Sequence, residues 1–344
     1  MSQQADQAYL RTRLAIMGGN LLGNEKLHAL TQLPPEELAR QTGFEAIKGS
    51  NDAARLAAFE RALIQIWLGE LSTLLRPLKG AARQLLSQWA SRYELLNIKA
   101  LIRGKTGHFA NEEIERSLFK LPCFLSLDYD QLINTDSVAE LLRHLQKTRY
   151  RRLATQALRQ YEERPEPFLL DATLDQHFYN DLINRSQRLE ADDRTETLNM
   201  IGRFVDRRNL VWSLRYRFCY GLQPSQILYL AIDGGRVLNR SRLQQIVQAE
   251  TLNEALMLLP DNLLSHGEMP KEIIKIEVAM RDDLSKYAQR AMRISPSAVT
   301  SVLAYLVLRH GEIRKIYAIL HARIHGLSDS LLDEALDPLQ ESAA

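Results

Sequence analysis

Glycine and proline are scarce in this sequence, with 16 and 11 instances among 344 residues. Both residues are costly inside helices and common in β-turns, so their scarcity favours helix over sheet. Cysteine is rarer still, and Cys123 and Cys219 are its two instances. Two cysteines exclude a disulfide framework and fit a reducing compartment. Their apolar neighbours predict packed, unreactive thiols.

Long apolar runs are also missing. The longest candidate, residues 298–308, is about half the length of roughly 18 residues that a membrane span needs. Residues 1–9 are polar and lack the basic and apolar regions of a secretory signal. We therefore expect a soluble protein with no direct membrane span, which would have to work through a partner if it works at a membrane.

An excess of one charge is absent too, because 44 Lys and Arg residues against 42 Asp and Glu residues give a net charge of +2. A dedicated nucleic-acid binder carries a stronger basic field. Two local basic stretches remain, at 147–152 and 203–220, and the second interleaves arginines with aromatic residues. Such a stretch suits stacking on single-stranded nucleic acid. At this net charge, a protein-partner surface or a set of internal ion pairs is favoured.

What the sequence does have is a nearly continuous helical periodicity. Apolar residues recur at spacings of three and four, as in Leu56, Phe59, Leu63 and Trp67. Strand-like alternation bounded by turn pairs is almost absent. No long or low-complexity linker divides the chain. The sequence therefore predicts an all-α fold in one body.

One helix pattern occurs three times, at 94–105, 206–217 and 312–323. Each copy opens with an acid, has Asn or Lys three residues later with an aliphatic residue beside it, and closes with basic residues. Each is followed by a glycine and by a residue that starts a new helix: Gly107 and Asn111, Gly221 and Pro224, Gly326 and Ser328. The polar residues of this pattern, taken as structural or interface candidates, are Asn97, Arg103, Lys105, Asp206, Asn209, Arg215, Arg217, Glu312, Arg314 and Arg323.

The three copies predict three helical pseudo-repeats, at about 1–120, 121–235 and 236–344, arranged as a funnel with approximate threefold symmetry. The aliphatic stripe of each copy should pack against its neighbours, so Ile98, Leu210 and Ile316 are expected to be buried. The alternative is that amphipathic helices resemble one another by composition alone. The recurring glycine and helix start favour true repeats.

No catalytic, cofactor or metal site is predicted. The phosphate-binding pattern Gly-x4-Gly-Lys-Ser/Thr is absent, and residues 103–107 have the spacing of a helix end instead. His321 and His325 lie one helical turn apart, but no general-base Glu and no third ligand accompany them. We therefore expect a protein that is not an enzyme.

The order and spacing of several motifs resemble the C subunit of the V-type and A-type rotary ATPases, the family to which the d subunit of eukaryotic vacuolar enzymes belongs. Lys315, where the family often has Asn, and His321, at the repeat position of Arg103 and Arg215, depart from its pattern. The segments that carry the resemblance are 9–33, 97–105, 174–175 with 178–179, 205–217, 234–235 with Leu238, and Tyr305 with 312–327.

This resemblance implies an all-helical, non-catalytic central-stalk subunit without cofactors, present as a single copy. Its partners would be the central shaft subunits and the membrane proteolipid ring. It would be cytoplasmic, attached peripherally to the membrane through the ATPase complex. There it would act as a socket that couples shaft rotation to the ring for ATP-linked proton or sodium transport. The alternative from another class is a helical nucleic-acid-binding or scaffold protein, which a salt-dependent affinity for nucleic acid would favour.

Overall fold

The computed structural model describes residues 3–42, 51–125, 127–163, 167–265 and 269–327. Helix accounts for 76% of the structure, and the described residues contain no strand, so the all-α prediction is confirmed. In the same ranges, no helix combines the length and the apolar character needed to cross a membrane.

The first third of the described chain starts with three shorter helices and continues into a long helical hairpin. Its helices are α1 (Gln3–Gly19), α2 (Asn24–Thr31), α3 (Pro35–Gln41), α4 (Asp52–Leu75), α5 (Gly80–Ala90), α6 (Arg92–Thr106) and α7 (Asn111–Ser117). The Asn51 side chain caps α4 by accepting a hydrogen bond of 2.9 Å from the Ala54 N–H. The apolar stripe that begins at Leu56 is buried along α4, as its periodicity predicts.

The middle third ends in the long helix that carries the second copy of the pattern. Its elements are the 3₁₀ turn η1 (Cys123–Leu125), α8 (Tyr129–Ile133), α9 (Val138–Leu145), α10 (Arg151–Glu163), α11 (Pro167–Ser186), α12 (Ala191–Leu214) and the π-helical turn η2 (Arg215–Cys219). The last third contains α13 (Pro224–Leu230), α14 (Arg240–Gln248), α15 (Leu252–Met257), α16 (Ile273–Ile294) and α17 (Ala298–Ile324).

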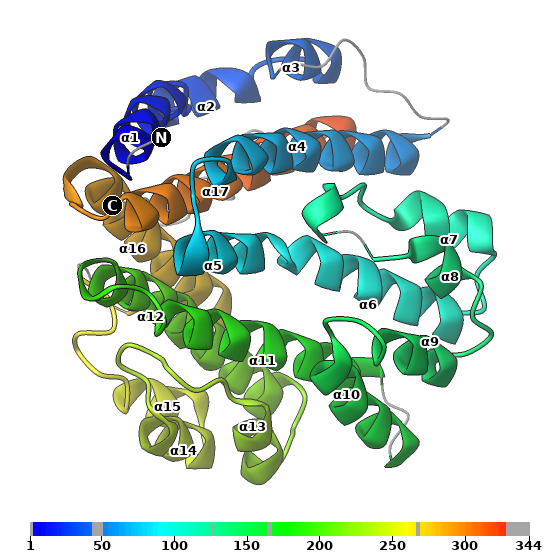
Figure 1. Ribbon diagram of the computed structural model, residues 1–344. Helices are drawn as coiled ribbons and strands as arrows, with labels where there is room; N and C mark the ends of the chain where they lie inside the picture. The colour runs from blue at the N-terminus through cyan, green and yellow to red at the C-terminus, as the bar shows by residue number, and fades with distance from the viewer. Residues whose placement is uncertain (1–2, 43–50, 126, 164–166, 266–268, 328–344) are drawn as a thin grey trace.

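The long helices lie in stacked layers (Figure 1). α4 lies with α17, α5 leads into α6 beside them, and α11 lies with α12 in the next layer, while α16 packs on both α12 and α17. Shorter helices gather outside these layers in three groups, α1–α3, α7–α9 and α13–α15. Each group packs on one helix that carries the repeated pattern: α1–α3 on α17, α7 and α9 on α6, and α14 on α12.

Two of these peripheral groups share a capping device. The N-cap residue of α9 is Ser137, three residues before Glu140, and the N-cap residue of α15 is Thr251, three residues before Glu254. In each pair the hydroxyl accepts a hydrogen bond of 3.2 Å from the N–H of the glutamate. The glutamate carboxylate in turn accepts from the N–H of the residue before the hydroxyl, at 2.8 Å and 3.0 Å. These reciprocal bonds satisfy donors that a helix N-terminus leaves free.

Large aromatic side chains fill the centre of the core. Trp67 of α4, Tyr93 of α6 and Tyr305 of α17 are all fully buried. The Trp67 ring meets Tyr93 edge-on with centroids 5.2 Å apart, and its indole N–H donates to the Leu306 carbonyl at 3.2 Å. Because buried indole and phenol groups need polar partners, these contacts fix the rings as well as burying them.

Local details of the helix ends differ partly from expectation. Gly221 and Gly326 adopt left-handed φ angles of +66° and +63°, as C-terminal glycines commonly do. After the first copy, His108 takes the left-handed conformation at φ +52° instead of Gly107. New helices do begin at Asn111 and Pro224. The expected start at Ser328 lies outside the described residues.

The prediction of packed thiols is wrong, because Cys123 and Cys219 are both exposed. Cys123 lies in the surface turn η1, and Cys219 ends the π-helical turn η2. Its neighbour Tyr220 is also exposed. At both cysteines, apolar neighbours in the sequence therefore do not indicate a buried side chain, because each cysteine lies at one end of a short helical turn.

Candidate functional site

The three copies of the pattern lie on α6, α12 and α17, and their aliphatic positions are buried. Ile98, Leu210 and Ile316 are 0%, 0% and 3% exposed, which confirms the expectation for these residues. The polar residues of the pattern therefore extend from helices whose apolar stripes are fixed in the core. Their partners show what the pattern holds together.

The acid that opens each copy is buried. In the second copy, Asp206 accepts hydrogen bonds from the backbone N–H groups of Val237 and Leu238, at 3.0 Å and 2.9 Å. Burial raises the pKa of Asp206, and the two backbone bonds oppose that rise. A buried carboxylate is costly without such donors. Asp206 therefore fixes the loop before α14 to α12.

The acids of the other two copies also bind segments outside their own helix. Glu312 of α17 accepts a hydrogen bond of 3.2 Å from the Leu22 N–H, between α1 and α2. Glu94 of α6 accepts from the Tyr150 hydroxyl and pairs with Arg149, just before α10. Each acid thus ties a long helix to a segment distant in sequence.

Two asparagines form matching clamps on the backbone. The Asn97 amide donates to the Phe119 carbonyl at 2.9 Å and accepts from the Phe119 N–H at 2.8 Å. The Asn209 amide makes the same two bonds to Ile232, at 2.7 Å and 2.9 Å. The third copy has Lys315, and an ammonium group can only donate. This two-way clamp is therefore a feature of α6 and α12.

The basic residue that closes each copy donates to a backbone carbonyl at the end of a short helix. The bonds run from Lys105 to Ile133 of α8, from Arg217 to Ala249 after α14, and from Arg323 to Thr31 of α2. Carbonyls at a helix C-terminus have no partner within the helix, and a cation is well placed to satisfy them. The same contact therefore occurs at all three peripheral groups.

The remaining basic positions of the pattern are more exposed. Arg103 lies 3.7 Å from Asp171, and Arg215 lies 2.9 Å from Glu277. Arg314 is exposed and has no ion pair among the described residues. Exposed ion pairs contribute little to stability. These three arginines are therefore available to a partner in a way that the buried acids and asparagines are not.

Arg314 belongs to a basic cluster at which the three helices meet. Arg92 of α6, Arg207 and Arg208 of α12, and Arg314 lie near enough to His310 of α17 for their charges to act on its ring. Burial, followed by these four positive charges, holds the pKa of His310 well below its ordinary value. Burial lowers the pKa of Arg92 to about 10, so this group stays charged at neutral pH. We call these five residues the basic cluster.

Aromatic faces take the place of carboxylates beside several of these arginines. The stacked pairs are Arg92 on Trp89 at 3.6 Å, Arg208 on Trp212 at 5.1 Å and Arg207 on Phe204 at 5.8 Å. Cation–π contacts stabilise a guanidinium without neutralising it. Nη2 of Arg92 and Nε of Arg207 are buried and have no hydrogen-bond partner within the described part of the chain. The basic cluster therefore keeps its positive charge and part of its donor capacity.

Sequence reasoning missed one buried network. On α17, Tyr305, Arg309 and Glu312 follow one another along one face, and Glu70 of α4 lies against them. The Tyr305 hydroxyl donates to Glu70 at 2.9 Å, and Arg309 bonds both Glu70, at 3.1 Å, and Glu312. Burial and Glu70 raise the pKa of Tyr305 well above its ordinary range. The spacing of these residues at intervals of four and three was the available signal.

A metal centre is not formed by the residues that the structure describes, which contain no group of three or more His, Cys, Asp or Glu suited to hold an ion. The rings of His321 and His325 lie 4.4 Å apart at the end of α17. The acids, the asparagines and the closing basic residues of the repeated pattern instead make hydrogen bonds to other segments of the chain.

Fold and site together define an all-α protein in which polar residues of the repeated pattern hydrogen-bond to other segments of the chain. We call these residues the fasteners: Glu94, Asn97, Lys105, Asp206, Asn209, Arg217, Glu312 and Arg323. A model of the ATP synthase (C/AC39) subunit family matches residues 10–335, so the chain belongs to this family. The C subunit of the A-type ATP synthase of Methanosarcina mazei is 25% identical over 343 residues, covering 96% of this chain and 93% of the relative. That of Halorubrum lacusprofundi is 25% identical over 344 residues, covering 95% and 96%.

A third relative, the C subunit of the A-type ATP synthase of Methanosphaera stadtmanae, is 25% identical over 328 residues, covering 92% of this chain and 83% of the relative. The family and these names identify a non-catalytic, structural subunit and not an enzyme, in agreement with the sequence prediction. The resemblance noted from the motifs is confirmed. These matches favour the ATP synthase subunit over a nucleic-acid-binding or scaffold protein.

Proposed function

We propose that this chain is a central-stalk subunit of a V/A-type rotary ATPase and acts as the socket between the rotating shaft and the membrane proteolipid ring. It transmits torque and performs no chemistry itself. One copy in each complex lies on the cytoplasmic face and attaches to the membrane peripherally, through the ring. Proton or sodium movement through the ring is thereby coupled to ATP turnover.

The observation that carries this proposal is the threefold recurrence of polar fasteners on α6, α12 and α17, in a chain that belongs to the ATP synthase subunit family. A part that transmits torque must not let its helices slide past one another. Buried hydrogen bonds with fixed geometry oppose sliding better than apolar contacts, which are not directional. The fasteners lie where a peripheral helix group meets a central helix.

The three pseudo-repeats proposed from the sequence gain support from the same contacts, with one change of membership. The helices α1–α3 pack on α17 and not on α6. Arg323 binds the end of α2, as Lys105 binds the end of α8. We therefore assign the N-terminal helices to the third module. The chain then closes on itself around a funnel of approximate threefold symmetry.

The basic cluster is our candidate for the surface that receives the shaft. Its cations come from all three helices that carry the pattern, so a partner that reaches them contacts every module at once. Opposite charges across an interface fix register and speed association. The end of the shaft should therefore present acidic groups to this cluster. Arg314 is the exposed member and the best residue for a test.

The test uses membranes stripped of this subunit and then reconstituted with it. Without the subunit, the catalytic head should still hydrolyse ATP, while ATP-driven ion pumping collapses. Adding back the unmodified chain should restore pumping. Arg314→Glu should restore it poorly and bind the shaft more weakly, whereas Arg293→Glu, an exposed charge on α16, should behave as the unmodified chain does. Normal pumping by stripped membranes would show that the socket assignment is wrong.

A further inference from the structure

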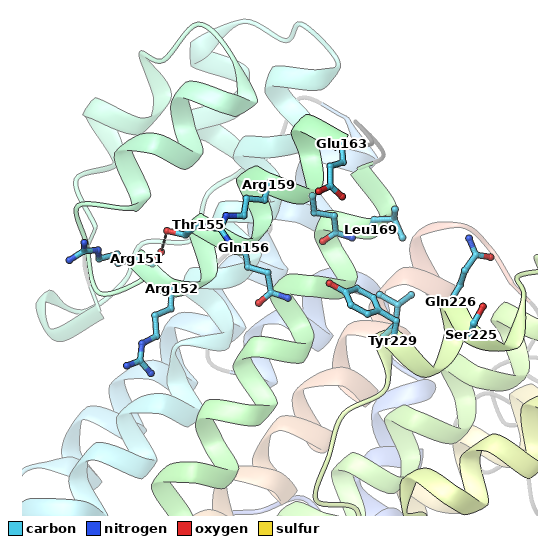
Figure 2. Close-up of a pocket in the computed structure, with 12 residues that line it drawn as sticks. Arg151, Arg152, Thr155, Gln156, Arg159, Glu163, Leu169, Ser225, Gln226 and Tyr229 are labelled. Atoms are coloured by element: carbon cyan, nitrogen blue, oxygen red, sulfur yellow. Dashed lines mark hydrogen bonds between the residues drawn. The ribbon is translucent and has the colours of Figure 1, made fainter.

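A groove of about 1080 Å³ lies between α10 and α13, and no residue of the basic cluster lines it (Figure 2). α10 forms one wall, and Ser225, Gln226 and Tyr229 of α13 form the other. The half-buried Leu169 adds apolar surface to its lining, and the buried Leu230 lies behind it. We call this feature the α10–α13 groove. It includes the end of the basic stretch noted in the sequence, a stretch that the proposed socket leaves without a role.

The wall formed by α10 carries a regular row of polar side chains. Arg151, Thr155, Arg159 and Glu163 follow one another at intervals of four, so they lie along one face of the helix. Arg152 extends this row at the same end as Arg151 (Figure 2). Three positive charges and one negative charge thus line the groove, with Arg151 and Arg152 at one end, Arg159 further along and Glu163 at the other end.

These three arginines are exposed, and none has an ion pair with any residue that the structure describes. Their basic neighbours differ. Arg149 is paired with the buried Glu94, and Arg143 lies 3.5 Å from Glu162. These two neighbouring arginines thus have carboxylate partners, whereas the three arginines in the groove have none among the described residues.

We propose that the α10–α13 groove binds an acidic amphipathic helix from a partner protein. Carboxylates spaced by four residues on that helix would pair with the row of arginines on α10. Its apolar side chains would contact the half-buried Leu169 and the ring of Tyr229, which is 56% exposed. α10 has 13 residues and is about 20 Å long. A partner helix of similar length would lie along it.

The residues that line the groove favour an acidic protein helix over a membrane surface or a nucleic acid. A flat membrane surface does not enter a concave groove. Nucleic acid is bound by basic grooves with several stacking rings, and this groove has one aromatic residue, Tyr229. Mixed amide, hydroxyl and apolar groups instead match the mixed side chains of an amphipathic helix.

The experiment measures binding of a labelled probe to the full chain by fluorescence anisotropy. The probe is a 15-residue helical peptide of Ala, Leu and Glu with glutamates at every fourth position. A second peptide carries Gln in place of Glu. We expect saturable binding of the acidic peptide, weaker by about tenfold or more for the Gln peptide and at higher salt, because each exposed ion pair contributes modestly and several act together.

The triple variant Arg151→Gln, Arg152→Gln, Arg159→Gln should bind the acidic peptide at least about tenfold more weakly. Its matched control replaces three exposed arginines elsewhere by Gln, Arg116, Arg188 and Arg293, and should bind as the unmodified chain does. Circular dichroism and thermal unfolding check that both variants fold. Equal binding by the two triple variants, or no saturable binding of the acidic peptide, overturns the proposal. So does arginine-dependent binding to phosphatidylserine vesicles with none to the peptide.

Discussion

Replacing Asn209 by alanine tests whether the repeated polar residues stabilise the fold as fasteners. Asn209 is 2% exposed and makes two hydrogen bonds to the backbone of Ile232, which is also 2% exposed. Alanine removes both bonds. The N–H and the carbonyl of Ile232 are then buried without these partners.

The magnitude follows from these two groups. A buried polar group left unsatisfied costs about 1–3 kcal/mol, so the pair costs about 2–6 kcal/mol. The better helix propensity of alanine returns about 0.5 kcal/mol. The net loss in the free energy of unfolding is therefore about 2–5 kcal/mol. An unfolding entropy of about 2.1 cal/mol/K per residue converts this into a Tm lower by about 3–7 °C, if the whole chain unfolds as one unit.

Urea unfolding followed by circular dichroism measures the difference directly. The matched control is Asn199→Ala on the same helix, because the Asn199 side-chain oxygen is buried and has no partner among the described residues. The control should stay within about 0.5 kcal/mol of the unmodified chain. Equal losses in the two variants, or an unchanged Asn209→Ala protein, would refute the fastener argument.

Two further predictions use other parts of the structure. Gly235→Ala should lower the free energy of unfolding in urea by about 1–3 kcal/mol. The added Cβ would lie 2.4 Å from Asp206 Oδ1 and 2.7 Å from the Leu238 carbonyl oxygen. Its control is Gly19→Ala, whose added Cβ meets nothing within 4 Å. The pKa of His310 is lowered in the folded state, so the stability linked to it is complete above about pH 6.5 and is lost as pH falls further. His310→Gln should therefore flatten that part of the pH profile of urea midpoints, and an unchanged slope would contradict this assignment.

The sequence predicts the helices well because their signal is local. Leu56 and the residues that follow it at intervals of three and four are buried on α4, and the aliphatic residue after each Asn or Lys of the pattern is buried too. The spacing of apolar residues shows which face of a helix is buried, and a stretch of a few helical turns is enough to recognise it. The exposed thiols of Cys123 and Cys219 show the limit of the same argument at helix ends.

The sequence does not predict which groups the polar residues of the pattern bind. The pattern marks Asp206 and Glu312 as equivalent, but it does not say that one binds a backbone about thirty residues ahead and the other a backbone 290 residues behind. The α10–α13 groove likewise depends on two helices that are far apart in sequence and meet only in the folded chain. Spacing identifies candidate residues, whereas tertiary contacts decide which of them are buried fasteners and which remain exposed, as Arg314 does.

The contact between Glu312 and Leu22 affects how the chain is made. During translation at roughly 5–20 residues per second, the 290 residues that separate the two take about 15–60 s to synthesise. The helices α1–α3 thus leave the ribosome early and wait for α17, their partner at the far end of the chain. Their buried side chains, such as Leu27 and Leu38, need protection from aggregation over that interval. Within the part of the chain that the structure describes, the last helix to be synthesised is the one that covers the first.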